Sequence, residues 1–183
     1  MRRTLLAVAT AAMLVTAGCA GLTGGDANGT VSFYVSDQQH AMDDFEHLNV
    51  TVTEVAYRPA GEDNSSLVTR DVDDVRVDLT QLKGENATLV GNTTVPAGNY
   101  TGVFVRVTNA SGVLESGDRV DVKVPSDKLH VNSQFEIGDG ESVSFVYDIT
   151  VVKAGGSGKY VIQPVVGESG TNVPIQPVDA TTD

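Results

Sequence analysis

Tryptophan is absent from this 183-residue chain, aromatic residues make up only 5% of it, and Cys19 is its single cysteine. A lone cysteine excludes a disulfide within the chain. The scarcity of aromatic rings argues against a sugar-binding face built from stacked rings. The apolar run near the N-terminus, residues 4–15, is shorter than the roughly 20 residues that a membrane-spanning helix needs. It is better explained as part of an export signal.

The N-terminal residues contain the three parts of such a signal. Arg2 and Arg3 supply positive charge, the apolar run follows, and Thr16-Ala17-Gly18 supplies small residues before Cys19. We therefore predict a signal peptide over residues 1–18. Its last residues resemble the lipobox of lipoproteins, with Thr16 where leucine is usual, and this predicts lipidation of Cys19. An ordinary cleavage site beside an incidental thiol is the alternative. The paired arginines also resemble a twin-arginine signal, so export before or after folding stays open.

Lipidation would hold the protein on the outer face of the cytoplasmic membrane. Residues 19–28 are predicted to be a flexible linker behind the lipid. Residues 29–167 form one predicted domain, which is long enough to bury a self-sufficient core. Residues 168–183 are acidic, contain proline and lack periodicity, so we expect a disordered tail.

Acidic side chains dominate the charge. Without residues 1–18, which hold 2 of the 12 basic residues, the chain has 24 acidic and 10 basic residues, a net charge of −14. Such a surface repels phosphate groups, so neither nucleic acid nor an anionic lipid surface is an expected partner. Aspartate occurs 16 times and lysine only 5 times, a balance that resembles proteins of salt-adapted organisms. We favour a halophilic, archaeal source over an ordinary acidic exported domain.

Asparagines are concentrated in the acceptor pattern for N-linked sugars. Seven of the nine asparagines lie in Asn-x-Ser/Thr, where the 30 serines and threonines among 183 residues would give one or two by chance. In an exported protein this pattern predicts exposed, glycosylated positions. The predicted sites are Asn28, Asn49, Asn64, Asn86, Asn92, Asn99 and Asn109.

Alternation of apolar and polar residues predicts strands along most of the domain. The clearest runs are residues 31–35, 48–52, 103–107 and 143–151. The phase slips near Thr53-Glu54, which indicates a β-bulge. Only residues 80–83 suggest a helical turn. These features predict an all-β domain, an antiparallel β-sandwich of immunoglobulin or transthyretin type with about seven to nine strands.

The segment "GNTTVPAGNYTG" places two acceptor asparagines around one turn. Pro96 fixes its own φ and Gly98 supplies a conformation that other residues resist, so a tight connection into a core strand is expected. Asn92 and Asn99 should then both be exposed.

Several of these segments resemble, in order, a family of bacterial and archaeal lipoprotein domains, domain of unknown function 4382. The resemblance covers residues 29–167 and is carried by "GTVSFYVSD", "VPAGNYTGVFVRV", "VKVPS" and "FEIGDGESVSFVYDI". It implies a surface β-sandwich and no defined activity. The family usually has Asp-Ala-Pro where Asp37 is followed by Gln38-Gln39 here. It also has two aspartates near Asp148, where one remains, so a metal bound there in relatives would lack a ligand here.

Acidic and histidine residues provide no convincing metal site. His40, His47 and His130 are not spaced as a metal-binding pair. A solvated loop is favoured for Asp43-Asp44-Glu46, between His40 and His47. Calcium is not favoured at residues 71–74 either, because Asp71, Asp73 and Asp74 lack the glycine and final glutamate of a calcium loop.

Catalytic motifs are equally weak. The glycine-rich residues 154–160 lack the spacing of a phosphate-binding loop and predict a hairpin instead. No serine lies in a nucleophile-elbow pattern. We therefore expect no enzyme, no cofactor and no metal site.

The sequence thus favours a lipid-anchored, glycosylated surface module with a structural, adhesive or interaction role, whose partners are the membrane, through its lipid, and other surface proteins or glycans. The alternative is a surface lipoprotein that binds a solute or carbohydrate. A cluster of exposed tyrosines on one concave surface would favour that alternative.

Overall fold

The computed structural model describes residues 27–37, 42–61, 66–126, 128–155 and 158–180. Over these ranges the chain forms eleven strands and two short 3-10 helices, and no α-helix. The prediction of an all-β domain is therefore confirmed. The strands are β1 (Asn28–Ser36), β2 (Phe45–Pro59), β3 (Val68–Asp78), β4 (Asn86–Pro96), β5 (Gly98–Leu114), β6 (Arg119–Lys123), β7 (Lys128–Val131), β8 (Phe135–Ile137), β9 (Ser142–Ala154), β10 (Lys159–Pro164) and β11 (Gln176–Val178). The 3-10 helices are η1 (Leu79–Leu82) and η3 (Val166–Glu168).

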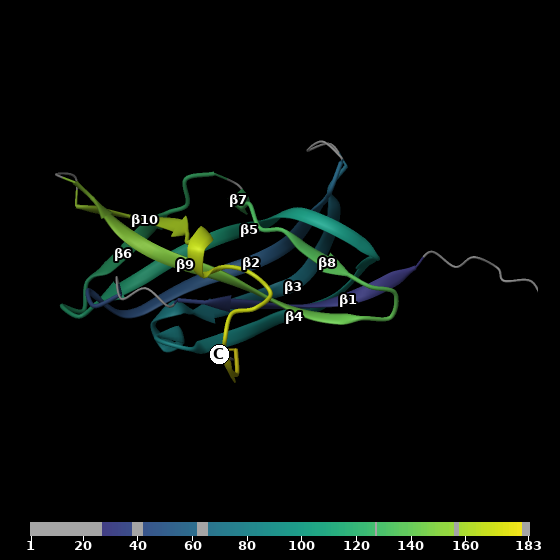
Figure 1. The fold of residues 1–183 in the computed structure, drawn as a ribbon. Helices are drawn as coiled ribbons and strands as arrows, with labels where there is room; N and C mark the ends of the chain where they lie inside the picture. Colours follow the sequence, from purple (N-terminus) through teal and green to yellow (C-terminus); the bar gives the residue numbers. More distant parts are fainter. Residues whose placement is uncertain (1–26, 38–41, 62–65, 127, 156–157, 181–183) are drawn as a thin grey trace, which may run out of the picture.

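All eleven strands belong to one hydrogen-bonded sheet. Its order is β11-β4-β1-β9-β10-β6-β5-β2-β3, and β7 and β8 pair with β5 beside this path. The sheet curls into a half-barrel, and its long strands run lengthwise along the molecule (Figure 1). Because the curl brings distant strands face to face, one continuous sheet surrounds its own core.

The predicted antiparallel sandwich needs correction. Three strand pairs are parallel: β1 with β9, β6 with β10, and β4 with β11. Each of these pairs joins strands that are remote in the sequence. Local alternation sets which side chains point inward but contains no information on strand direction. The immunoglobulin-type arrangement is not confirmed.

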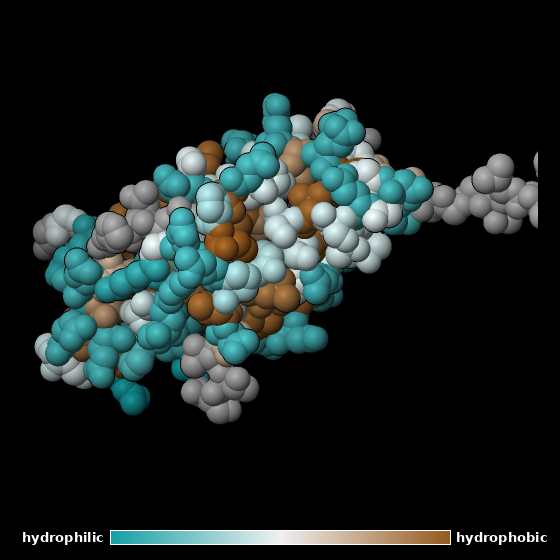
Figure 2. All heavy atoms as spheres, turned by 60° about the horizontal axis from the view of Figure 1, so that its bottom comes forward, coloured by the Kyte–Doolittle hydropathy of each residue, from teal (hydrophilic) through white to brown (hydrophobic). Residues whose placement is uncertain are grey.

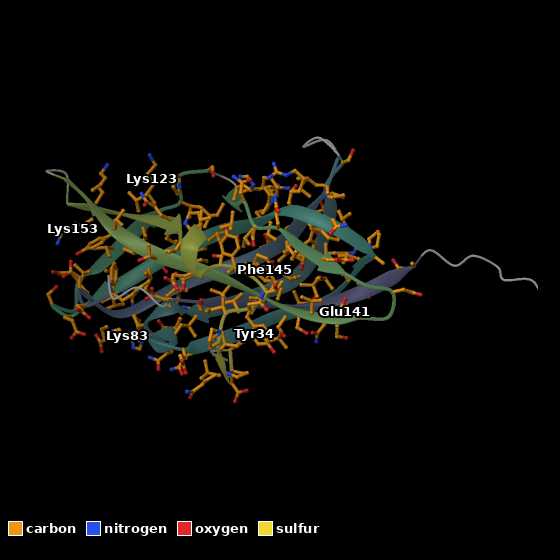
Figure 3. The ribbon with its side chains drawn as sticks, viewed as in Figure 1. Tyr34, Lys83, Lys123, Glu141, Phe145 and Lys153 are labelled. Carbon is orange, nitrogen blue, oxygen red and sulfur yellow. The ribbon has the colours of Figure 1, made fainter. Side chains whose placement is uncertain are left out.

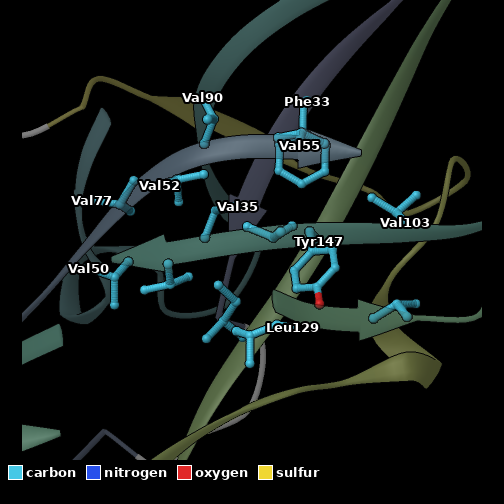
Figure 4. Packing of buried hydrophobic residues seen from close by; sticks show 14 of the residues in the cluster. Phe33, Val35, Val50, Val52, Val55, Val77, Val90, Val103, Leu129 and Tyr147 are labelled. Atoms are coloured by element: carbon cyan, nitrogen blue, oxygen red, sulfur yellow. The ribbon is translucent and has the colours of Figure 1, made fainter. Parts of the chain in front are cut away.

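The core is built from the alternating residues that the sequence identifies. Inward positions of β1, β2, β5 and β9 are almost fully buried, and their side chains meet in one cluster (Figure 4). Figure 4 shows Phe33, Val55 and Tyr147 converging from three different strands. Valines and rings of this kind suit the pleated, half-buried surface of a strand. Their burial supplies the main driving force for folding.

Two contacts draw the ends of the curled sheet together. Inside the core, the Tyr57 hydroxyl lies 2.8 Å from Thr93 Oγ1, linking β2 to β4. Burial raises the pKa of the Tyr57 hydroxyl, so it stays protonated and able to donate. Outside, Arg70 Nε of edge strand β3 donates to the Thr94 carbonyl of β4 at 2.8 Å. The side chains thus close a gap that the backbone ladder leaves open.

The bulge predicted at Thr53-Glu54 is confirmed. Pairing of β2 with both β3 and β5 shifts register between Val52 and Glu54. Buried positions accordingly change from Val50 and Val52 to Val55 and Tyr57. Strand β9 ends at Ala154 and β10 begins at Lys159, and the two strands are antiparallel neighbours, as the predicted hairpin requires.

The Pro96–Gly98 connection joins strands that do not pair with each other. β4 pairs with β1 and β11, whereas β5 pairs with β2, β6, β7 and β8. The connection therefore crosses from one side of the core to the other. Asn92 and Asn99 are both exposed, as predicted, and Tyr100 turns inward to donate from its hydroxyl to the Pro96 carbonyl at 2.6 Å.

The segment expected to be a disordered tail contributes to the sheet over part of its length. Gln176–Val178 forms β11 beside the start of β4, and Gly170 bridges to Val146 of β9. These backbone hydrogen bonds explain why this part of the segment has a defined structure, because they pair polar groups along two strand edges. Cys19, His40 and Asn64 lie outside the described residues.

Gly98→Val should destabilise the domain. Gly98 has a φ of +152°, which a β-branched residue adopts poorly, although no atom lies within 4 Å of the position that a Cβ would take. We expect a loss of about 1–3 kcal/mol in the free energy of unfolding, from backbone strain alone. Gly91→Ala is the control, because Gly91 is not among the glycines with positive φ and a Cβ added there would make an ordinary contact with Val72 Cγ1 at 3.6 Å. Urea denaturation of wild type and both variants tests this. If Gly98→Val were as stable as wild type, the connection would not require glycine.

Candidate functional site

A groove on the outer face of the sheet is the candidate site because two arginines line it, whereas a larger hollow of about 500 Å³, lined by Tyr100 and Phe135 among others, has no basic residue in its lining. It has a volume of about 350 Å³ and crosses four neighbouring strands, β3, β2, β5 and β6. Its lining residues are Asn49, Arg76, Ser111, Gly112, Val113, Arg119, Val120 and Asp121. Leu48 and Val50, which flank Asn49 on β2, point into the core. Strand alternation therefore turns Asn49 outward to the groove.

Strand register aligns the polar groups of the groove. Asn49 of β2 is directly opposite Ser111 of β5, and Ser111 is opposite Asp121 of β6. Directly opposite side chains on one face have Cβ atoms about 5 Å apart. An amide, a hydroxyl and a carboxylate thus form one row across three strands. Such a row presents both donors and acceptors to a polar ligand.

The groove also contains two of the five arginines that follow the predicted signal peptide. Arg76 comes from β3 and Arg119 from the start of β6, on opposite sides of Asn49 and Ser111. Arg76 also interacts with another residue of the chain. Within the described residues, the Arg119 guanidinium forms neither a hydrogen bond nor an ion pair. The groove lining thus contains two arginines and one acidic residue, Asp121, on a protein whose net charge is negative.

Two predicted glycosylation sites meet beside this groove. The segments Asn49-Val50-Thr51 and Asn109-Ala110-Ser111 lie antiparallel, with Asn49 opposite Ser111 and Thr51 opposite Asn109. Asn49 is half-buried and β2 is paired on both sides there, with Asp78 of β3 as its other neighbour. The hydroxyl residue of each acceptor pattern therefore lies next to the asparagine of the other.

The other predicted sites vary in exposure. Asn28, Asn92, Asn99 and Asn109 are exposed, and Asn49 and Asn86 are half-buried. Asn92 Oδ1 accepts from Ser32 Oγ at 2.7 Å, and Asn86 Nδ2 donates to the Gln81 backbone carbonyl at 3.1 Å. None of the six described asparagines is buried in the core.

A second polar cluster joins β7 to the outer face. Arg58 donates to Thr101 Oγ1 at 3.2 Å and to Asn132 Oδ1 at 2.6 Å, and its guanidinium lies 3.1 Å from His130 Nε2. The His130 ring stacks on Phe104 at 4.1 Å between centroids. Burial, and then the charge of Arg58, lowers the pKa of His130. These groups satisfy one another, so the cluster holds β7 in place.

His47 is in the opposite electrostatic situation. Its Nδ1 lies 2.7 Å from Asp78 Oδ2, and Asp78 Oδ1 also accepts from the Leu48 backbone amide. The hydrogen bond to Asp78, reinforced by its charge, raises the pKa of His47. Asp78 itself is buried and caps η1 through the Thr80 amide. The pair fixes the start of η1 against β2.

The acidic stretches are dispersed in space. Asp44 accepts from Tyr160 at 2.6 Å and from Lys153 at 3.2 Å, contacts that lower its pKa. Asp71, Asp73 and Asp74 lie exposed along β3, in a strand and not in a loop. No three His, Cys, Asp or Glu side chains of the described residues are grouped closely enough to hold a metal.

Two buried carboxylates lie at the positions that the family resemblance singles out. Asp37 and Asp148 are each at most 1% exposed. Asp148 Oδ2 accepts from Ser36 at 2.8 Å, and the Asp148 backbone amide donates to Ser169 Oγ. Asp37 follows Ser36 on the neighbouring parallel strand. The contacts of Asp148 with Ser36 and Ser169 tie residues 165–170 to the sheet.

Two of the five tyrosines line hollows: Tyr100, together with Phe135, lines one of about 500 Å³, and Tyr160 lines one of about 270 Å³. Tyr57, Tyr100, Tyr147 and Tyr160 are buried, and Tyr34 is half-buried. In Figure 3 Phe145 lies in the middle of the molecule, while Lys83, Lys123 and Lys153 lie at its outer edges. Figure 2 shows polar residues over most of one face, with small separate apolar patches. The described rings therefore belong mainly to the core.

A family model named Domain of unknown function (DUF4382) matches residues 28–164. The chain belongs to this family. Its description assigns no activity, and no curated protein matches the chain. The solved structures include one similar chain, the NMR structure of a protein from Eubacterium rectale. It is 12% identical, covers 81% of this chain and 98% of its own length, and has a TM-score of 0.24. Among the described residues, no helix is long and apolar enough to cross a membrane.

Sequence patterns identify only part of the groove. Asn49 is recognisable as an outward residue in an acceptor pattern, but Arg76, Arg119 and Asp121 carry no motif. Outward alternation on each strand is the available signal. It does not reveal that residues as far apart as Asn49 and Asp121 share one row.

The two described histidines should affect stability in opposite directions. The pKa of His47 is raised in the folded protein. Its contribution to the free energy of unfolding is therefore complete at a pH below its pKa in the unfolded chain, about 6.5, and disappears as the pH rises through its pKa in the folded protein. His130 has a lowered pKa, so stability decreases as pH falls below about 6.5. Each effect should be less than about 1 kcal/mol because both rings are partly exposed.

Urea denaturation between pH 5 and 8 tests this expectation. Relative to wild type, His47→Gln should lose stability mainly at the acidic end, and His130→Gln should lose it mainly at the alkaline end. The free energy of unfolding of wild type minus that of the variant is plotted against pH. Loss of a packed ring changes this difference by the same amount at every pH, whereas a changed titration makes it depend on pH. Two flat difference curves would show that neither histidine titrates differently on folding.

Proposed function

We propose that the protein is a lipid-anchored, N-glycosylated module on the outer face of the cytoplasmic membrane, with a structural, adhesive or interaction role. The lipid is attached to Cys19, and residues 19–28 link it to the β domain. The partners are the membrane, through the lipid, and neighbouring surface proteins or glycans. The strongly acidic composition favours a salt-adapted, archaeal source, where dense carboxylates retain water and counterions.

The single observation that carries this proposal is the excess of acceptor asparagines. Seven acceptor patterns exceed the one or two expected by chance, and none of the six described ones lies in the core. Asn132 and Asn172, outside any acceptor pattern, are exposed as well, so exposure is a requirement that the six sites meet and the excess is the supporting signal. Exposure on strands and turns is what an attached oligosaccharide requires. The export signal supports the same location.

The exposed acceptor asparagines at the Pro96–Gly98 connection suit a protective coat of sugars. Asn92 and Asn99 flank this connection, and an oligosaccharide on either is large compared with it. Sugars there would cover the end of the domain and hinder pairing with other sheet edges. A coat of this kind is consistent with a module that faces water and other surface molecules.

Lipidation predicts a change in partitioning on replacing Cys19. Cys19→Ser should leave the protein soluble or retained as a precursor. The wild type should enter the detergent phase, because each methylene group of the lipid that the detergent buries contributes about 0.8 kcal/mol. Detergent phase separation of native membranes measures this, with Asn172→Gln as an unaffected control. Equal partitioning of wild type and Cys19→Ser would exclude the anchor.

Glycosylation predicts a defined loss of mass for single substitutions. Asn92→Gln and Asn99→Gln should each remove one oligosaccharide without changing the free energy of unfolding by more than about 0.5 kcal/mol, because both side chains are exposed. Asn172→Gln is the matched control, since Asn172 is exposed but lies before Val173-Pro174, outside any acceptor pattern. Intact-mass measurement and peptide mapping give the answer. Unmodified asparagines in the exported protein would refute the glycosylated module.

A further inference from the structure

The outer groove combines a positive charge with neutral hydrogen-bonding groups in a chain of formal net charge −12. Outside the groove, the other described arginines are engaged: Arg58 with Asn132, Arg70 with the Thr94 carbonyl, and Arg106 with Glu54. The Arg119 guanidinium, by contrast, faces the groove without a hydrogen bond or ion pair among the described residues. An anionic group in the groove would supply its partner.

Planar guanidinium groups match carboxylates through paired hydrogen bonds. Between the two arginines, the Asn49 amide and the Ser111 hydroxyl supply donors and acceptors suited to hydroxyl groups. Asp121 adds an acceptor that would repel a carboxylate but hold a hydroxyl. A ligand with one carboxylate and several hydroxyls satisfies all these groups. We propose that the groove binds a carboxylate-bearing sugar unit, a uronic acid, of an acidic polysaccharide.

The size of the groove agrees with a single sugar unit. Small-molecule sites range over about 300–1,000 Å³, and this groove, at about 350 Å³, is at the lower end. The groove is also partly open, so neighbouring units of a polysaccharide can extend over the sheet. Recognition here rests on charge and hydrogen bonds. It needs no aromatic platform, and no aromatic residue lines this groove.

Asn49 is less accessible than the asparagines proposed to carry sugars. The β2 backbone pairs at Asn49 with Asp78 on one side and Ser111 on the other, and the Asn49 side chain is half-buried, whereas Asn28, Asn92, Asn99 and Asn109 are exposed. We therefore assign the Asn49 amide to the groove and the sugars of the proposed coat to the exposed asparagines. The inference is independent of the lipid anchor.

Titration of the full chain in detergent with galacturonate, galactose and acetate tests the ligand class. Backbone amide shifts in NMR spectra give both affinity and location. Galacturonate should bind at least about tenfold more tightly than galactose, since only its carboxylate can accept charge-assisted hydrogen bonds from Arg119. It should also bind at least about tenfold more tightly than acetate, which lacks hydroxyls. The shifts should concentrate on residues 49, 76, 111 and 119–121. Equal affinity for galacturonate and either control, or shifts centred elsewhere, would overturn the proposal.

Two variants test the assigned groups. Arg119→Gln should weaken galacturonate binding about tenfold or more and leave galactose unaffected, and Asn49→Asp, of nearly equal size, should abolish galacturonate binding by repulsion. Lys83→Gln is the charge-matched control, because Lys83 is exposed on another part of the chain, paired with Asp43. Unchanged binding in Arg119→Gln would overturn the proposal, as would an oligosaccharide on Asn49 of the native protein. Absence of sugars from every acceptor asparagine would instead refute the glycosylated coat and leave the groove intact.

Discussion

Parallel pairing of β1 with β9, the third and fourth strands in the order of the sheet, is the constraint on which the architecture depends. Seven consecutive residues of β1, Thr30–Ser36, align with Ser142–Asp148 of β9. The rings of Phe33 and Phe145 stack across this pair at 6.1 Å between centroids. Parallel neighbours cannot be joined by a tight turn. The intervening chain must therefore leave β1, build β2 to β8, and return beside it.

This constraint explains where a site can form. The returning chain closes the half-barrel around Tyr57, Phe33 and other large buried side chains, so the interior is filled with packed residues. The opposite, outer face of the long β2–β5 pair remains available. The bulge between Val52 and Glu54 divides that face. The groove at Asn49 lies on one side of the bulge, and the Arg58–His130 cluster lies on the other.

Local and non-local information explain what the sequence can predict. Alternation is local, so the inward residues of β1, β2, β5 and β9 and the bulge near Thr53 are evident from the amino-acid pattern alone. Strand partners depend on contacts between remote segments, so the parallel pairs and the position of β11 cannot be predicted from the local pattern. The same limit applies to the groove. Asn49 is visible as an outward polar residue, but its row with Ser111 and Asp121 exists only through two strand registers.

Electrostatics links the groove to the acidic surface around it. At low ionic strength the net negative charge repels any carboxylate that approaches, and the two arginines act against this background. At about 1 M salt the Debye length shrinks to about 3 Å, which removes long-range repulsion between exposed charges. Hydrogen bonds made at contact by Arg119 and Asn49 depend less on that range. In molar salt, the negative charge of the protein therefore no longer keeps acidic ligands away, and binding depends mainly on interactions made at contact. The large negative charge and a groove for an anion are thus compatible features of one protein.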